Sequence, residues 1–156
     1  MASTRGTQEL TKAGIAFSLH PYVYDPNADR VGMAAAEALG LDPALTLKTL
    51  MVEVDGKPAC CVIPSDASLS MKKVAAAFGG KAAAMMPPAK AEKLTGYHVG
   101  GISPFGQRKP PLVAIDATPC EAEKIWINAG QRGLLLGIAP KDALSHLKAK
   151  AVPLTA

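Results

Sequence analysis

Aromatic residues are scarce in this chain, since Phe, Trp and Tyr together make up 4% of its 156 residues. Proteins that hold single-stranded nucleic acid on stacked aromatic rings need several such side chains on one surface, so the composition argues against a stacking platform. Strong charge is lacking as well. A formal net charge of +4 suits transient contact with a polyanion, but it is far from the charge density of a histone-like protein.

Long hydrophobic runs are also missing, although 49% of the residues are hydrophobic. No run reaches the roughly 18 residues that a membrane span requires, and residues 1–6 lack the apolar core of a signal peptide. We therefore expect a cytoplasmic protein with no membrane contact. The apolar content is sufficient for the core of one domain, which we place over residues 1–156.

The three cysteines have no metal-binding spacing. Cys60 and Cys61 are adjacent in an expected strand, Cys120 stands alone, and no CxxC or Cys/His pattern occurs. We expect reduced thiols, because a buried structural cysteine is commoner than a catalytic nucleophile. We expect no metal and no organic cofactor.

Caps, turns and apolar patterns predict a mixed α/β chain. Helices are expected over 3–13, 32–39, 70–78, 87–94 and 140–147, with a further helical turn opened by Asp42-Pro43. Strands are expected over 15–24, 45–55, 58–63, 82–86, 112–116, 125–128 and 134–138, with a last one near Val152. Asp55-Gly56 is a strong hairpin signal between two of the strands.

Lys48 is unusual in the expected strand 45–55. Under period-2 alternation it shares a face with Leu50, Val52 and Val54. Burying an ammonium group is costly unless it is paired or reaches water. Lys48 therefore either extends to solvent at the strand end or points into a polar cavity that takes an anionic or carbonyl group.

The segment from Gly96 to Gly106, with the sequence GYHVGGISPFG, cannot continue a regular helix. Without side chains at Gly100 and Gly101, a ligand can approach the backbone, and neighbouring N–H groups can donate to a carbonyl or phosphate oxygen. Pro104 restricts the shapes of the loop and lowers the cost of ordering it. The alternative is an ordinary tight turn between strands.

Together these motifs resemble the YbaK family, the bacterial cysteinyl-tRNA(Pro) deacylases related to the editing domain of prolyl-tRNA synthetase. The resemblance rests on Leu47-Lys48-Thr49-Leu50, on Gly-Gly-Ile-Ser-Pro-Phe-Gly after Val99, and on Gly130-Gln131-Arg132-Gly133-Leu134. It runs from about Thr7 to Leu147. It implies a curved, partly barrel-like mixed sheet surrounded by helices.

The resemblance also implies a reaction and a site. The enzyme would hydrolyse the ester of mischarged tRNA(Pro), in contact with prolyl-tRNA synthetase, and the cysteine thiol of the substrate would attack its own ester. The catalytic residues implied are Lys48, Gly100 and Gly101. The substrate contacts implied are Tyr22, Val31, Thr49, Ile102, Ser103, Pro104 and Asn128. His98, next to the loop, is a weaker candidate for a general base.

Three positions depart from the family pattern. Asn128 replaces a small hydroxyl residue, Leu135 replaces an acidic residue, and Val31 replaces an aromatic one. These changes leave the reaction class intact and leave the amino-acid preference open between cysteine and alanine. A noncatalytic module that binds tRNA, a synthetase or DNA is the alternative of a different class, supported only by the basic net charge.

Overall fold

A computed structural model describes residues 3–25, 27 and 31–156, without the side chains of residues 31 and 32. The described helices are α1 (Arg5–Lys12), α2 (Val31–Leu39), α3 (Met71–Ala77), α4 (Pro88–Thr95), α5 (Pro140–Leu147) and the short 3-10 helix η1 (Thr118–Glu121). The described strands are β1 (Ser18–Pro21), β2 (Thr46–Val54), β3 (Lys57–Pro64), β4 (Ala83–Met85), β5 (Leu112–Asp116), β6 (Ile125–Gln131), β7 (Leu134–Ile138) and β8 (Lys150–Val152).

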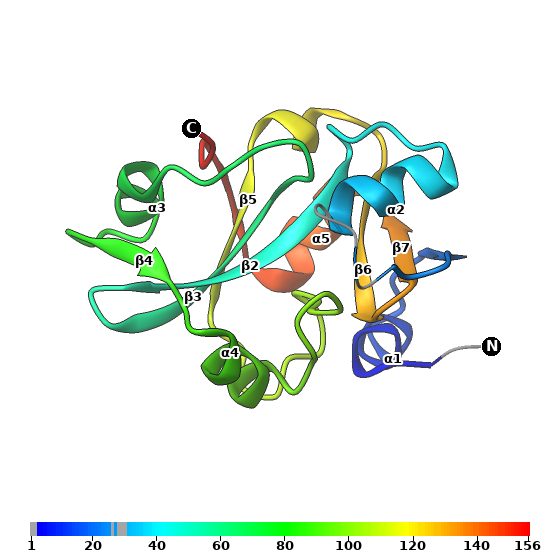
Figure 1. The fold of residues 1–156 in the computed structure, drawn as a ribbon, viewed down its shortest axis with the longest axis horizontal. Helices are drawn as coiled ribbons and strands as arrows, with labels where there is room; N and C mark the ends of the chain where they lie inside the picture. Colours follow the sequence, from blue (N-terminus) through cyan, green and yellow to red (C-terminus); the bar gives the residue numbers. More distant parts are fainter. Residues whose placement is uncertain (1–2, 26, 28–30) are drawn as a thin grey trace.

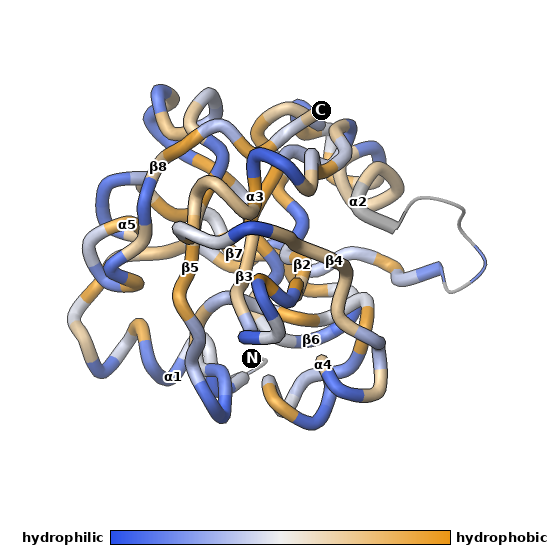
Figure 2. Tube along the Cα trace, turned by 90° about the vertical axis from the view of Figure 1, so that its left-hand side faces the viewer, coloured by the Kyte–Doolittle hydropathy of each residue, from blue (hydrophilic) through white to orange (hydrophobic). Residues whose placement is uncertain are grey.

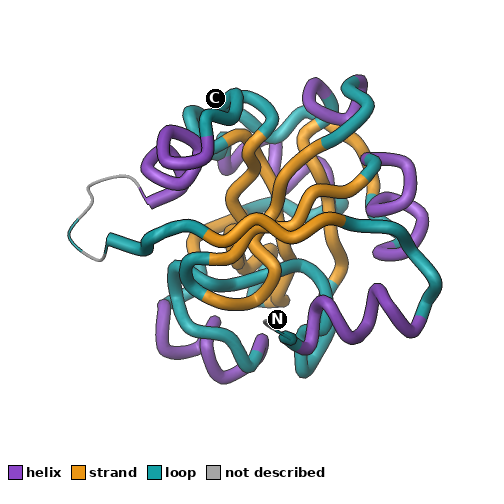
Figure 3. The backbone as a smooth tube through the Cα atoms, turned by 90° about the vertical axis from the view of Figure 1, so that its right-hand side faces the viewer, coloured by secondary structure: helices purple, strands orange, loops and turns teal. Residues whose placement is uncertain are grey.

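The strands form one mixed sheet in the order β1-β7-β6-β2-β3-β5-β8, and β4 pairs with β2 beside this path. The pairs β2–β6, β3–β5 and β5–β8 are parallel and the others antiparallel. The strands cross in the middle of the molecule and the helices lie around them (Figures 1 and 3). The mixed α/β class and the curved mixed sheet therefore agree with the sequence-based expectation.

The core lies on both faces of this sheet. One apolar cluster includes Leu10 of α1, Phe105 of the glycine loop and Ile127 of β6. The second includes Val52 of β2 and Val74 of α3. Figure 2 shows hydrophobic colouring mainly along the inner strands and hydrophilic colouring mainly on the outer turns. Burial of the loop residue Phe105 ties the glycine loop to the core.

Two of the expected elements differ from the structure. The strand expected over 15–24 is limited to Ser18–Pro21, because only those residues have partners in the short strand β7. The Asp42-Pro43 turn does not become a helix. Its polar groups instead serve a turn, in which Asp42 Oδ1 accepts a hydrogen bond from the Ala44 N–H (2.9 Å).

The hairpin signal is confirmed. Asp55 and Gly56 connect β2 to β3 with φ angles of 49° and 81°, the left-handed conformation that a two-residue type I′ turn requires.

No helix in the described part of the chain is long and apolar enough to cross a membrane.

Candidate active site

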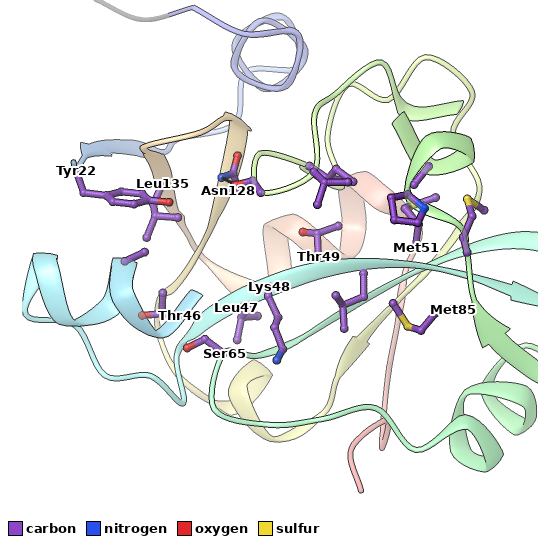
Figure 4. A pocket seen from close by; sticks show the side chains of 18 residues that line it. Tyr22, Thr46, Leu47, Lys48, Thr49, Met51, Ser65, Met85, Asn128 and Leu135 are labelled. Carbon is purple, nitrogen blue, oxygen red and sulfur yellow. Dashed lines mark hydrogen bonds between the residues drawn. The ribbon is translucent and has the colours of Figure 1, made fainter. Parts of the chain in front are cut away.

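A cavity of about 410 Å³ lies between β2, α2, α4, the glycine loop and the strands β6 and β7. Its lining is shown in Figure 4. Most of the lining side chains are apolar, and Met85 and Val99 remain about half exposed (49% and 43%). The volume falls in the range of small-molecule sites.

The cavity lies at a gap in the pairing of β2. On this edge β2 pairs with β6 through Thr46 and Leu47 and with β4 through Val52–Val54. Between these points, from residue 48 to 51, no other strand of the described chain pairs with the edge. Residues 46–51 all line the cavity, since the open edge is accessible from both faces of the strand.

Thr49 lies in the middle of this gap. The Leu45 carbonyl accepts a hydrogen bond from the Trp126 N–H (2.9 Å), and the Met51 carbonyl accepts one from the Met86 N–H (3.1 Å). Alternate residues of a strand direct their backbone groups to the same edge, so the Thr49 N–H and C=O also face the open edge. Its Oγ1 is buried without a hydrogen-bond partner in the described structure. An unsatisfied buried hydroxyl is costly, which favours a ligand as its partner.

Lys48 is the only cationic side chain among the described residues that line the cavity. It is half-buried, and it points to the opposite side of β2 from Thr49, on the side of Ser65 (Figure 4). The expected alternation is found, because Leu50, Val52 and Val54 pack in the core cluster on one face of this strand. Lys48 thus lines the cavity, and it lies at the end of a row of side chains on one face of β2 whose other members, Leu50, Val52 and Val54, are apolar.

The glycine loop contributes Gly100 to the cavity wall but not Gly101. Gly100 has a φ of +92°, and no hydrogen bond from its N–H is found within the described chain. The Gly101 N–H donates to the His98 carbonyl (2.8 Å), and a Cβ at Gly101 would lie 2.7 Å from the backbone nitrogen of Arg132. Gly100 is therefore better placed to donate to a ligand, whereas Gly101 allows the loop to pack on the β6–β7 turn.

Asn128 uses its side chain to hold this loop. Its Nδ2 donates to the Gly100 carbonyl (3.3 Å), and its Oδ1 accepts from the Gly130 and Gln131 N–H groups (2.7 and 3.1 Å). These bonds lie at the register shift between β6 and β7. Asn128, which we expected to contact substrate, lines the cavity, and its amide also joins the bulge to the glycine loop.

Replacing Asn128 with Ala should lower the free energy of unfolding by about 1–3 kcal/mol, because three backbone groups in partly buried hydrogen bonds lose their partners. Urea denaturation measures this. Gln131→Ala is the control, since that side chain is exposed and its loss should cost less than about 0.5 kcal/mol. Equal unfolding midpoints for Asn128→Ala and the native chain would contradict the structural role.

The remaining candidate residues of the glycine loop either line the cavity or support the loop. Ile102 lines the cavity. Ser103 is fully buried and its Oγ accepts the Phe105 N–H (3.2 Å), while Pro104 lines a separate cavity of about 250 Å³. The Tyr97 hydroxyl donates to the Phe105 carbonyl (2.6 Å). Ser103 and Pro104 therefore support the loop and do not line the larger cavity.

Tyr22 and Leu135 lie together on the β7 side of the cavity (Figure 4). Burial raises the pKa of the Tyr22 phenol, which therefore stays neutral at physiological pH. Leu135 is buried and makes this wall apolar. Val31 is the first residue of α2, and its side chain lies outside the described residues.

Activated protein nucleophiles are not found in the described wall of the cavity. All three cysteines are free thiols, and burial raises the pKa of Cys61 to about 12 and that of Cys120 to about 11. The pKa of Cys60 is raised for the same reason. His98, 83% exposed, lies 3.6 Å from the Glu92 carboxylate and does not line the cavity. Within the described residues, no group of three or more potential metal ligands is present.

Arg132, which was not among the candidate residues, lies beside the loop. Its Nε donates to the Val99 carbonyl (2.9 Å), and its guanidinium lies 5.3 Å from the centre of the Tyr24 ring. The motif around Arg132 was visible in the sequence, but nothing local showed that the β6–β7 turn reaches the glycine loop. Ser65 was missed because the expected strand 58–63 ends before it. In the structure β3 runs to Pro64, and the Ser65 N–H donates to the Thr46 carbonyl (2.9 Å) at the open end of the β2–β3 hairpin.

Comparison with known proteins identifies one family for this chain. The profile of the aminoacyl-tRNA editing domain matches residues 25–145. EbsC of Enterococcus faecalis, named as a candidate Cys-tRNA(Pro)/Cys-tRNA(Cys) deacylase, is 39% identical over 116 residues, which cover 72% of this chain and 69% of that protein. YwhH of Bacillus subtilis, an uncharacterised protein, is 28% identical over 109 residues, 69% of each chain.

Two solved structures share the fold. A candidate trans-editing enzyme for prolyl-tRNA synthetase superposes with a TM-score of 0.84 at 22% identity, covering 97% of this chain and 95% of the other. The protein APE2540 gives a TM-score of 0.86 at 21% identity, covering 98% and 100%. At these identities the likeness concerns the fold alone.

Proposed function

Because the chain belongs to the aminoacyl-tRNA editing domain family, we propose that it is a trans-editing deacylase that hydrolyses mischarged cysteinyl-tRNA(Pro). Synthetase pockets reject a smaller or near-isosteric amino acid by only a few kcal/mol, so a second site that removes the error is the expected solution. The partners proposed are mischarged tRNA(Pro) and prolyl-tRNA synthetase. The proposed location is the cytoplasm, where tRNA is charged.

The observation that carries this proposal is a small cavity with one cation, an unsatisfied buried hydroxyl and no activated protein nucleophile in its described wall. An aminoacyl ester is already activated, so positioning and stabilisation of the developing oxyanion can supply much of the catalysis. Lys48 is proposed to hold the 3′-terminal nucleotide. Gly100 is proposed to donate its N–H to the ester carbonyl.

Thr49 completes the proposed set. Its Oγ1 and its open backbone edge can hydrogen-bond the amino acid or the terminal ribose. Tyr22 and Ile102 are proposed to enclose the amino-acid side chain with apolar surface. Gly101, Ser103 and Pro104 are assigned to the support of the loop on the contacts described above, and Asn128 both supports the loop and lines the cavity.

The substrate can supply the nucleophile. The cysteine sulphur attacks the ester carbonyl carbon, the bond from that carbon to the 3′-terminal ribose oxygen breaks, and the thiol proton passes to this oxygen. Cysteine leaves as a cyclic thioester, which water then opens to the free amino acid. The step needs no protein nucleophile, in agreement with the raised pKa values of Cys61 and Cys120.

The proposal is tested by following deacylation of cysteinyl-tRNA(Pro) at catalytic protein concentration. Turnover well above the spontaneous rate is expected. Binding of the tRNA without turnover would instead favour a noncatalytic module.

Prolonged dialysis against EDTA should leave the deacylation rate unchanged, because the proposed chemistry uses a backbone N–H, a lysine and the substrate thiol. Rates are compared before and after dialysis, with a mock-dialysed sample as control. Loss of activity that Zn²⁺ restores would contradict this expectation.

A further inference from the structure

Two exposed arginines converge beside the glycine loop. Arg5 begins α1, and Arg108 follows the loop in sequence. Arg5 Nη1 lies 3.1 Å, and Arg108 Nε 3.5 Å, from the point where a Cβ of Gly96 would be. The two guanidinium groups are therefore close neighbours over a residue that has no side chain. We call Arg5 and Arg108 the arginine pair.

Nearby carboxylates do not neutralise the arginine pair. Glu9 accepts hydrogen bonds from the Gly106 N–H (3.0 Å) and pairs with His146 (2.9 Å). Glu92 accepts the Val99 N–H (2.9 Å). In the described part of the chain, neither arginine has an ion pair within 4.0 Å. Two like charges placed together without a counterion favour an external anion.

The helix ends near the arginine pair do not explain why two arginines lie together there. The last carbonyls of α4 are already met by backbone donors: Glu92 by Gly96, Leu94 by Lys109 and Thr95 by Arg108. Arg5 occupies the first turn of α1, where the helix dipole disfavours a cation and no acidic residue compensates for it. Attraction to the negative end of α4 remains as a structural alternative, worth about 0.3–1 kcal/mol for each exposed charge.

The arginine pair lies along the same segment as the cavity. Gly96 is four residues from Gly100, which lines the cavity, and a four-residue segment spans at most about 14 Å. Arginine matches phosphate geometry with two parallel hydrogen bonds. We propose that the arginine pair binds the RNA phosphate backbone a few nucleotides before the ester, and so directs the 3′ end into the cavity. This inference rests on the proposed function.

The test measures binding of an uncharged RNA minihelix of the tRNA(Pro) acceptor stem ending in CCA, by fluorescence anisotropy over a range of salt concentrations. For Arg5→Gln/Arg108→Gln we expect at least tenfold weaker binding at low salt. The slope of log affinity against log salt should fall by about 2, one for each lost contact. Arg108→Gln alone should give an intermediate loss and keeps the test usable if the double variant unfolds.

The matched control is Lys57→Gln/Lys72→Gln, which removes the same charge from exposed sites on β3 and α3, at the other end of the molecule from α1 (Figure 1). Its RNA affinity should stay within twofold of the native chain. Equal losses in both double variants would reduce the effect to net charge and overturn the proposal. A lower melting temperature with unchanged RNA affinity would assign the arginines to the helix end and overturn it as well.

Kinetics separate this inference from the proposed function. For the arginine variant we expect a raised KM for cysteinyl-tRNA(Pro), kcat within twofold, and unchanged hydrolysis of a cysteinyl ester of adenosine, which has no phosphate. An unchanged KM for the tRNA would overturn the docking role. Failure of the native chain to hydrolyse either ester would overturn the proposed function, while the RNA-binding comparison would still decide the arginine pair.

Discussion

Lys48→Ala is expected to lower kcat/KM for deacylation of cysteinyl-tRNA(Pro) at least 100-fold, a loss of about 2.7 kcal/mol or more in transition-state stabilisation. Lys48 is the cation in the described wall of an apolar cavity, next to the open edge of β2. A positive charge there can fix the terminal nucleotide relative to Gly100, and misplacing a reacting group by about 1 Å costs about 100-fold.

The fold should survive this substitution. Lys48 is half-buried at the end of an apolar row, so its removal should change the free energy of unfolding by less than about 1 kcal/mol. Circular dichroism and urea denaturation measure this beside the kinetics. Lys72→Ala, on the exposed face of α3, is the control for loss of a lysine and should keep native activity. A Lys48→Ala protein with a rate within threefold of native would refute the assignment.

Lys48→Arg distinguishes charge from shape. Arginine keeps the positive charge but carries a wider planar head group and is hydrated differently from lysine. If Lys48 acts as a point charge on a phosphate or carbonyl, Lys48→Arg should recover part of the rate lost in Lys48→Ala. Equal losses in the two variants would mean that the shape of the lysine side chain is essential.

The sequence predicts best those features of the fold that depend on neighbouring residues. The hairpin at Asp55-Gly56 depends on two residues that accept positive φ, and it is found where the dipeptide occurs. The position of Lys48 follows from the alternation of one strand. Gly100 could be selected because a glycine cluster excludes a helix whatever surrounds it.

Features that depend on distant segments could not be predicted in this way. The open edge of β2 exists because β6 and β4 pair with its two ends, and these strands are far from β2 in sequence. The unsatisfied Thr49 hydroxyl lies at that open edge, and the role of Asn128 depends on the contact between the β6–β7 bulge and the glycine loop. For the same reason, Arg5 and Arg108 meet only when α1 lies against the glycine loop.

The second large effect that we expect is a preference of the deacylation rate for one esterified amino acid. Cysteinyl-tRNA(Pro) should be hydrolysed at least 100-fold faster than alanyl-tRNA(Pro), because alanine has no group with which to attack its own ester. Seryl-tRNA(Pro) should also be slow, since a hydroxyl is a far weaker nucleophile than a thiol. A pocket alone would give less discrimination, because a methylene-scale difference in apolar contact is worth about 1–3 kcal/mol.

Leu135 is apolar, and the Asn128 amide is used in hydrogen bonds to the backbone. The selectivity therefore depends on the nucleophile that the substrate itself carries. Neither residue supplies a base that could activate water for an alanyl ester, and burial keeps the Tyr22 phenol neutral. Parallel deacylation assays of the cysteinyl, alanyl and seryl esters on the same tRNA(Pro) measure the preference. Pre-treating cysteinyl-tRNA(Pro) with a thiol-alkylating reagent should abolish its hydrolysis while leaving spontaneous decay intact. If the alanyl ester reacts as fast as the cysteinyl ester, water is the nucleophile, and Gly100 and Thr49 position it against the carbonyl.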